Sequence, residues 1–227
     1  MENFFESREE ASLAAAARIV AALARRLAVQ PKTSMVVTGG SSPGQCYAAL
    51  AKTDLEWDRV QLLLSDERWV PPTHADSNEK MLRAELLVDN AAEADLLPLY
   101  APDTSVAERS ATLNDSIATL NIPFACSLLG MGDDGHIASL FPDLQDLDSY
   151  LEVDSSTFFV PIETVASPHA RISLTGSALT RSDEILLLFF GDDKRAVYEQ
   201  AKTSSTEFPV SRLLFQKRAP VHVFWAP

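Results

Sequence analysis

Short runs of apolar residues alternate along this chain with segments whose apolar residues recur at helical spacing. The first helical stripe contains residues three and four positions apart: Leu13, Ala16, Val20, Leu23 and Leu27. Ser7 and Glu10 precede it as a capping-box pair, and Pro31 follows it as a helix terminator. The pattern therefore predicts an amphipathic helix close to the start of the chain.

Later segments repeat an order of apolar run, turn and helix. Apolar runs without polar alternation occupy residues 35–37, 60–64, 124–129, 158–162, 171–174, 185–190 and 221–225. Helical patterns occupy about 43–51, 77–87, 107–120 and 194–202. Strands that are apolar on both faces and separated by helices indicate a mostly parallel sheet with helices on both faces. We expect one α/β domain over residues 1–227, since no repeat, linker or low-complexity tract divides the chain.

The charge balance excludes several classes of partner. Lys and Arg number 19 against 32 Asp and Glu, so the formal net charge at pH 7 is −13. Nucleic acid and anionic membranes both attract basic surfaces, so neither is an expected partner. The densest apolar run, 185–190, is far shorter than the ~20 residues that span a bilayer, and the first residues are acidic where a signal peptide is basic. We expect a soluble cytoplasmic protein, either a monomer or a dimer.

A glycine- and serine-rich loop at 39–44 follows the first predicted strand. In parallel α/β sheets, ligands bind beyond the carboxyl ends of the strands, and glycines there let the backbone approach an oxyanion. Gly40, Ser41 and Ser42 are therefore candidate phosphate-binding residues. Ser42 as N-cap and Pro43 at the first helical position fit a helix starting here. The loop lacks the Gly-Lys-Ser/Thr ending of a P-loop, and a plain strand-to-helix turn remains the alternative.

Basic side chains follow three other predicted strands. Arg68 lies within Ser-Asp-Glu-Arg-Trp at 65–69, which is either a solvated turn or part of a site. Its guanidinium is suited to hold a carbonyl oxygen on which negative charge develops. Arg171 and Lys194 are each explicable as surface charges, but together with the serine loop they would neutralise a phosphate dianion.

The loop at 130–135 reads Gly-Met-Gly-Asp-Asp-Gly and matches the dinucleotide fingerprint GxGxxG. Its two aspartates would oppose a pyrophosphate, so a nucleotide cofactor is disfavoured. A better interpretation is that the glycines expose Asp134 and His136, with His136 at the mouth of a following helix. Imidazole is the natural base near neutral pH, and Asp134 is placed to orient the ring.

Other candidates for metal or redox chemistry are sparse. Cys46 and Cys126 are interpreted as two small buried hydrophobes. No group of histidines, cysteines and carboxylates has metal-ligand spacing, and His74, His169 and His222 are taken as peripheral or structural. We therefore expect neither a metal nor a cofactor.

Taken together, these residues resemble the 6-phosphogluconolactonase family, within the superfamily that also contains glucosamine-6-phosphate deaminase and ribose-5-phosphate isomerase. The motifs that carry the resemblance are Ser-Asp-Glu-Arg-Trp at 65–69, Gly-Met-Gly-Asp-Asp-Gly-His-Ile-Ala-Ser-Leu-Phe-Pro at 130–142 and Arg-Ile-Ser-Leu-Thr-Gly at 171–176. The resemblance implies a modified Rossmann-like fold. It also implies hydrolysis of 6-phospho-D-glucono-1,5-lactone to 6-phosphogluconate in the pentose phosphate pathway.

The resemblance also assigns roles to residues by motif. By this resemblance, five residues are expected to bind the phosphate group of the substrate: Gly40, Ser41, Ser42, Arg171 and Lys194. His136 matches the catalytic base, with Asp134 and Arg68 beside it. The expected reaction is attack of a water, activated by His136, on the lactone carbonyl. No Gly-x-Ser-x-Gly motif indicates a serine nucleophile instead.

Two local differences favour the lactonase over the deaminase. At the positions that correspond to 137–142, the sequence pattern of the deaminase resembles Ile-Ala-Phe-Asn-Glu-Pro, whereas this chain has Ile-Ala-Ser-Leu-Phe-Pro. Phe141 therefore occupies the place of a carboxylate. At the positions that correspond to 65–68, the deaminase pattern resembles Met-Asp-Glu-Tyr, whereas this chain has Ser-Asp-Glu-Arg. A non-catalytic sugar-phosphate sensor is a further alternative, but the chain has neither the length nor the basic residues for a DNA-binding module.

Overall fold

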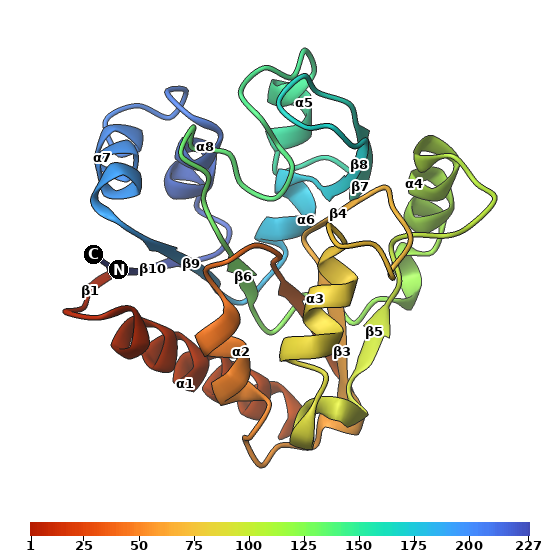
Figure 1. The fold of residues 1–227 in the computed structure, drawn as a ribbon, viewed down its shortest axis with the longest axis vertical. Helices are drawn as coiled ribbons and strands as arrows, with labels where there is room; N and C mark the ends of the chain where they lie inside the picture. The colour runs from red at the N-terminus through yellow and green to blue at the C-terminus, as the bar shows by residue number, and fades with distance from the viewer.

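Seven parallel strands form the main sheet, in the order β1-β10-β9-β6-β2-β3-β5 (Figure 1). The computed structural model describes the backbone of residues 1–227 and every side chain except that of Ala118. The strands are β1 (Glu2–Phe4), β2 (Thr33–Val37), β3 (Val60–Leu64), β5 (Asp95–Leu97), β6 (Ser127–Leu129), β9 (Ile185–Phe190) and β10 (Val221–Ala226). The mostly parallel sheet expected from the apolar runs is confirmed.

The strand order reverses direction between β2 and β6. From β2 the chain moves outward through β3 to β5, then returns to β6 on the other side of β2 and moves outward through β9 to β10. The two central strands pair at Val36 and Ser127. In open α/β sheets, such a switch point leaves a crevice at the carboxyl ends of the strands, where ligands bind. The loops that follow β2 and β6 are the serine loop and the loop that carries His136.

A second, antiparallel sheet contains three strands in the order β4-β8-β7. They are β4 (Asp66–Arg68), β8 (Arg171–Leu174) and β7 (Phe159–Ile162). The prediction that the runs at 158–162 and 171–174 join the parallel sheet is therefore wrong. Residues 66–68 are a strand and not a solvated turn, because β8 supplies backbone partners along their length. This pairing brings Arg68 directly opposite Arg171.

Eight α-helices connect the strands. They are α1 (Arg8–Leu27), α2 (Gly44–Leu50), α3 (Asn78–Glu85), α4 (Val106–Asp115), α5 (Leu147–Leu151), α6 (Gly176–Thr180), α7 (Asp192–Ala201) and α8 (Pro209–Phe215). Three short 3₁₀ helices are η1 (Trp57–Arg59), η2 (Asp89–Glu93) and η3 (Ile117–Thr119). Figure 1 shows α1 and α7 on opposite sides of β9, and both helices contact that strand. Helices therefore cover both faces of the main sheet, as predicted.

The first helix begins after its predicted cap, Ser7, but its buried face differs from the predicted stripe. Ser7 caps α1, because its Oγ accepts a hydrogen bond from the Glu10 N–H at 3.2 Å. Leu13 from the predicted stripe is exposed, whereas Ile19 is fully buried. The helix is rich in alanine, so several overlapping stripes have apolar character, and packing against the sheet selects among them.

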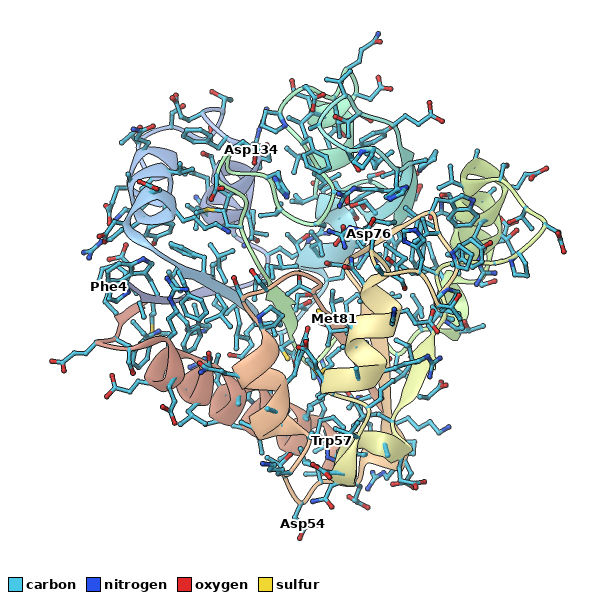
Figure 2. The ribbon with its side chains drawn as sticks, viewed as in Figure 1. Phe4, Asp54, Trp57, Asp76, Met81 and Asp134 are labelled. Atoms are coloured by element: carbon cyan, nitrogen blue, oxygen red, sulfur yellow. The ribbon has the colours of Figure 1, made fainter. Side chains whose placement is uncertain are left out.

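The core fills the space between the sheets and these helices. Its largest fully buried side chains include Trp57, Tyr47 and Phe124. Figure 2 shows Asp134 in the upper part of the molecule and Asp54 at its lower end, with Asp76 between them. Among the described residues, no helix combines the length and apolar character needed to span a bilayer.

Candidate active site

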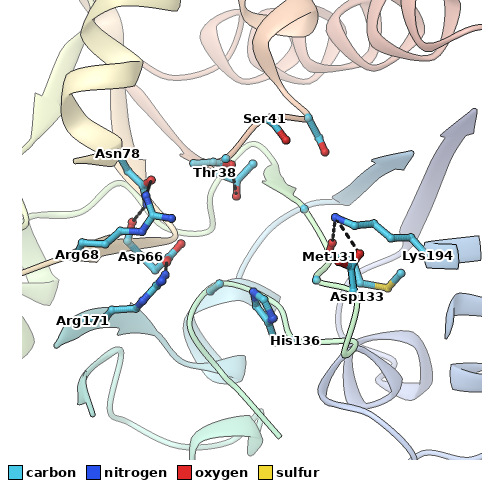
Figure 3. Close-up of a pocket in the computed structure, with 16 residues that line it drawn as sticks. Thr38, Ser41, Asp66, Arg68, Asn78, Met131, Asp133, His136, Arg171 and Lys194 are labelled. Carbon is cyan, nitrogen blue, oxygen red and sulfur yellow. Dashed lines mark hydrogen bonds and ion pairs between the residues drawn. The ribbon is translucent and has the colours of Figure 1, made fainter. Parts of the chain in front are cut away.

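The residues expected to carry the chemistry converge on one pocket, which has a volume of about 300 Å³ (Figure 3). Seven of the eight predicted site residues line it: Gly40, Ser41, Ser42, Arg68, His136, Arg171 and Lys194. The eighth, Asp134, hydrogen-bonds to His136 from outside this lining. Four further polar residues line the pocket that were not predicted as site residues: Thr38, Asp66, Asn78 and Asp133. The pocket lies over the switch point between β2 and β6, as expected for this class of sheet.

The serine loop forms the top of the pocket in Figure 3. Neither the Ser41 nor the Ser42 side chain forms a hydrogen bond within the part of the chain that the structure describes, so both hydroxyls are available to a ligand. The prediction that Ser42 caps the next helix is wrong: Pro43 is the N-cap of α2, and no side chain caps it. Gly39 permits a close approach, since a Cβ there would lie 2.1 Å from the Asn78 side chain.

Arg68 is held at the pocket by a polar network from the start of α3. Its Nη1 donates to the Asp76 carbonyl at 2.8 Å and to Asn78 Oδ1 at 2.9 Å. Asn78 Nδ2 in turn donates to the Asp66 carbonyl at 2.9 Å. Arg68 Nη2 forms no hydrogen bond among the described residues, and so remains free to meet a ligand oxygen.

Glu67 fixes the backbone beneath this network. The residue is 1% exposed, and its carboxylate accepts from the N–H groups of Arg68, Asn78 and Glu79 at 2.7–2.8 Å. Ser77 Oγ adds a fourth hydrogen bond at 3.0 Å. Burial raises the pKa of Glu67, although these hydrogen bonds oppose the shift. Glu67 is thus a buried cap for α3, which ties that helix to Arg68.

Arg171 lies opposite Arg68 and has its own acceptors. Its Nη1 is 3.5 Å from Asp66 Oδ2, and its Nε donates to Ser167 Oγ at 3.0 Å. The guanidinium lies over the Phe141 ring, 5.2 Å from the centroid. Burial lowers the pKa of Arg171, and Asp66 counteracts this effect. The pair of arginines is therefore stabilised by separate partners, despite their like charges.

His136 forms the predicted pair with Asp134. Its Nδ1 lies 2.6 Å from Asp134 Oδ1, and its backbone N–H donates to the same oxygen at 3.1 Å. A carboxylate can only accept, so Nδ1 donates and the neutral ring keeps its acceptor at Nε2. Burial acts to raise the pKa of Asp134, but the hydrogen bond and the charge of His136 outweigh it, so the pKa lies below its usual value.

The loop around His136 differs from its expected setting. No helix starts at His136: residues 137–146 are turns and irregular chain, and the next helix, α5, begins at Leu147. A helix dipole therefore does not act on the imidazole. Gly132 is required for close packing, because a Cβ there would lie 2.2 Å from His136 Nδ1. The ring also packs against Phe141, with centroids 4.4 Å apart.

Lys194 approaches the pocket from the first turn of α7. Its Nζ donates to the Met131 carbonyl at 2.7 Å and lies 3.9 Å from Asp133 Oδ1. Figure 3 shows Lys194 on the opposite side of the pocket from Arg171, with Ser41 and His136 between them. Arg171 and Lys194, the two cations predicted to bind a phosphate, therefore enter the pocket from different sides.

The sheet, its switch point and the pocket above it define an α/β protein of the doubly wound class. The sequence narrows this class, since the family described as "Glucosamine-6-phosphate isomerases/6-phosphogluconolactonase" matches residues 6–225. This chain belongs to that family.

Known proteins of high similarity support the same assignment. A 6-phosphogluconolactonase of Caulobacter vibrioides is 41% identical over 226 residues, which cover 98% of this chain and 95% of the relative. One of Pseudomonas aeruginosa is 36% identical, over 93% of this chain and 89% of its own. The crystal structure of a 6-phosphogluconolactonase from Shewanella baltica superposes with a TM-score of 0.94 at 30% identity, over 100% of this chain and 97% of that one.

Proposed function

We propose that this protein hydrolyses 6-phospho-D-glucono-1,5-lactone to 6-phospho-D-gluconate in the oxidative pentose phosphate pathway. The observation that carries the proposal is His136, hydrogen-bonded to Asp134 and located in one pocket with Arg68 and the serine loop. The names of relatives that match nearly the whole chain support it. Residues 1–227 would act as one catalytic domain.

The phosphate of the substrate binds beneath the serine loop. The backbone of Gly40 and the hydroxyls of Ser41 and Ser42 provide donors, while Lys194 and Arg171 provide charge from two sides. The protein as a whole is acidic, with a net charge of −13, so this local concentration of cations selects an anionic ligand. Anchoring the phosphate places C1 of the lactone toward His136.

His136 acts as the general base. With Nδ1 donating to Asp134, its Nε2 takes a proton from water as the water oxygen bonds to the lactone carbonyl carbon. Asp134 keeps the ring in this tautomer and stabilises the imidazolium that forms. The bond between C1 and the ring oxygen then breaks, which opens the ring, and the His136 imidazolium returns the same proton to that oxygen.

Arg68 stabilises the oxyanion of the tetrahedral intermediate. Two acceptors already hold its Nη1, so the orientation of the guanidinium is set before the substrate binds. Its Nη2 is then directed to the carbonyl oxygen where charge develops. No covalent intermediate is needed, because water is the nucleophile throughout.

Deamination of glucosamine 6-phosphate is the second candidate function, and the position of Phe141 argues against it. Phe141 is 4% exposed and lies between the His136 ring and the Arg171 guanidinium. Ring opening of an amino sugar and proton transfer between C1 and C2 need a carboxylate near the sugar as well as a base. A phenyl ring at this place neither accepts nor donates a proton.

One assay tests the proposal directly. Disappearance of 6-phosphogluconolactone is followed with and without the protein, and the spontaneous rate is subtracted. We expect rapid hydrolysis that depends on His136. A rate with the protein no higher than the spontaneous rate would refute the proposed function.

A further inference from the structure

Three metal-ligating side chains meet outside the pocket, on the two loops that approach its arginines. His74 and Asp76 belong to the loop between β4 and α3, and His169 belongs to the loop between β7 and β8. One ligand atom from each lies within 4.8 Å of the other two. None of the three lines the pocket. We propose that they form a binding site for a divalent transition-metal cation such as Zn²⁺, a property independent of the proposed lactonase activity.

The distances between the three side chains are near those of a tetrahedral metal site. His169 Nε2 lies 3.0 Å from Asp76 Oδ2, and His74 Nδ1 lies 3.8 Å from the same oxygen. Ligands at about 2.0–2.2 Å from a tetrahedral zinc lie about 3.3–3.6 Å from one another, so small rotations of these side chains suffice. The Asp76 N–H donates to His74 Nδ1 at 3.1 Å, so His74 either gives up that bond or binds through Nε2.

The donor set favours zinc-like metals over magnesium or calcium. Two imidazole nitrogens and one carboxylate oxygen suit Zn²⁺, whereas Mg²⁺ and Ca²⁺ prefer oxygen ligands alone. The side chains of His74 and Asp76 are 44% and 54% exposed, so water can reach the ion and fill the fourth position. Cys46 does not compete as a ligand, because burial raises the pKa of its thiol to about 12.

A cation at this place would connect two segments that hold pocket residues. The Asp76 carbonyl accepts a hydrogen bond from Arg68. Ser167 Oγ donates to the His169 carbonyl at 3.0 Å and accepts from Arg171 Nε at 3.0 Å. The site therefore joins the loop behind Arg68 to the loop behind Arg171, whereas its ligands remain outside the pocket.

Calorimetric titration of the metal-free protein with zinc chloride tests the proposal. We expect one Zn²⁺ per chain, and affinity at least about tenfold lower in both His169→Ala and Asp76→Asn, since each removes a direct ligand. Glu163→Gln is the matched control, because Glu163 is an exposed carboxylate with no hydrogen bond or ion pair among the described residues. His136→Ala separates this site from the catalytic pair and is expected to bind zinc as tightly as the wild type.

The unfolding temperature provides a second readout that needs no activity. His74 and Asp76 are distant in sequence from His169, so the site exists only in the folded protein, and zinc at a hundredfold excess over its Kd is expected to raise the Tm by about 5–10 °C. Both ligand variants must show reduced zinc-dependent shifts while retaining cooperative unfolding. Absence of zinc binding by the wild type, undiminished binding by both ligand variants, or loss of binding in His136→Ala would overturn the proposal.

Discussion

Arg68 and Arg171 lie directly opposite each other on neighbouring antiparallel strands at the edge of the pocket. Like charges in such a pair destabilise a sheet unless other groups compensate for them. Here Asn78 and the Asp76 carbonyl hold Arg68, while Asp66 lies beside Arg171. The arrangement concentrates positive charge at one side of the pocket in an otherwise acidic protein.

Replacing His136 by alanine is expected to lower kcat by about 10²–10⁴-fold, because a positioned general base contributes this much to the rate. The KM is expected to change little, since the lost interaction acts in the transition state. Steady-state kinetics on the lactone measures both constants, and thermal unfolding verifies that the variant is folded. Retention of more than a third of the wild-type kcat would remove His136 from the catalytic role.

Removing either proposed phosphate cation is expected to reduce substrate capture. Arg171→Ala and Lys194→Ala each lose a charge-assisted contact of about 1.5–3 kcal/mol, so kcat/KM falls by about one to two orders of magnitude. Lys217→Ala is the control, since Lys217 is an exposed lysine distant from the pocket lining. Equal rates on phosphorylated and unphosphorylated gluconolactone would contradict a phosphate anchor.

Replacing Glu67 by glutamine is expected to destabilise the fold by about 1–3 kcal/mol. The buried carboxylate accepts four hydrogen bonds, and a glutamine amide would turn one accepting oxygen into a donor that faces other donors. Urea unfolding measures the loss. The exposed Glu163→Gln change is expected to stay within about 0.5 kcal/mol, and equal effects of both variants would show that Glu67 caps nothing.

His222 is expected to reduce stability in mild acid. The ring is 1% exposed, its Nε2 lies 2.8 Å from Arg18 Nη2, and its Nδ1 has no hydrogen-bond partner among the described residues. Burial lowers the pKa of His222, and the charge of Arg18 lowers it further, whereas Glu184 opposes the shift. The unfolded chain therefore takes up this proton more readily than the folded one. The group costs no stability above about pH 6.5, and stability falls below it by at most about 1.4 kcal/mol per pH unit.

The His222→Gln variant isolates that contribution. Glutamine keeps an acceptor for Arg18 but does not titrate, so its stability is expected to fall less between about pH 7.5 and about pH 5.5 than that of the wild type. Urea unfolding at the two pH values gives the difference, in which contributions from other titrating groups cancel. Equal losses in both proteins would exclude His222 as the source.

Phe141 is expected to prevent deaminase activity. Release of ammonia from glucosamine 6-phosphate should be negligible in a preparation that hydrolyses the lactone rapidly, because position 141 carries a phenyl ring where the deaminase pattern has a carboxylate. Phe141→Glu alone is not expected to create a deaminase, since the Arg171 guanidinium lies over this position and would pair with the new carboxylate. Ammonia release by the unchanged protein at a rate rivalling lactone hydrolysis would show that the deaminase is the right branch of the family.

The sequence by itself determined the class of fold and the contents of two pocket loops. Apolar runs and helical stripes are local patterns, so they predicted five of the seven strands of the parallel sheet and most of its helices, but not the short edge strands β1 and β5. The serine loop and the pair of Asp134 and His136 each lie within a few consecutive residues. Their spacing therefore placed them after strands that end at the same edge of the sheet.

Only the tertiary structure decided which distant segments pair. Nothing local distinguishes a charged strand from a charged turn, so the pairing of β4 with β8 and the burial of Glu67 depended on long-range packing. Long-range packing also placed Asn78 in the pocket lining and Phe141 against His136 and Arg171. The cluster of His74, Asp76 and His169 joins positions up to 95 residues apart. Sequence spacing could not predict that these side chains lie close together. Periodicity specifies the elements, whereas the contacts between them depend on the packing of the whole chain.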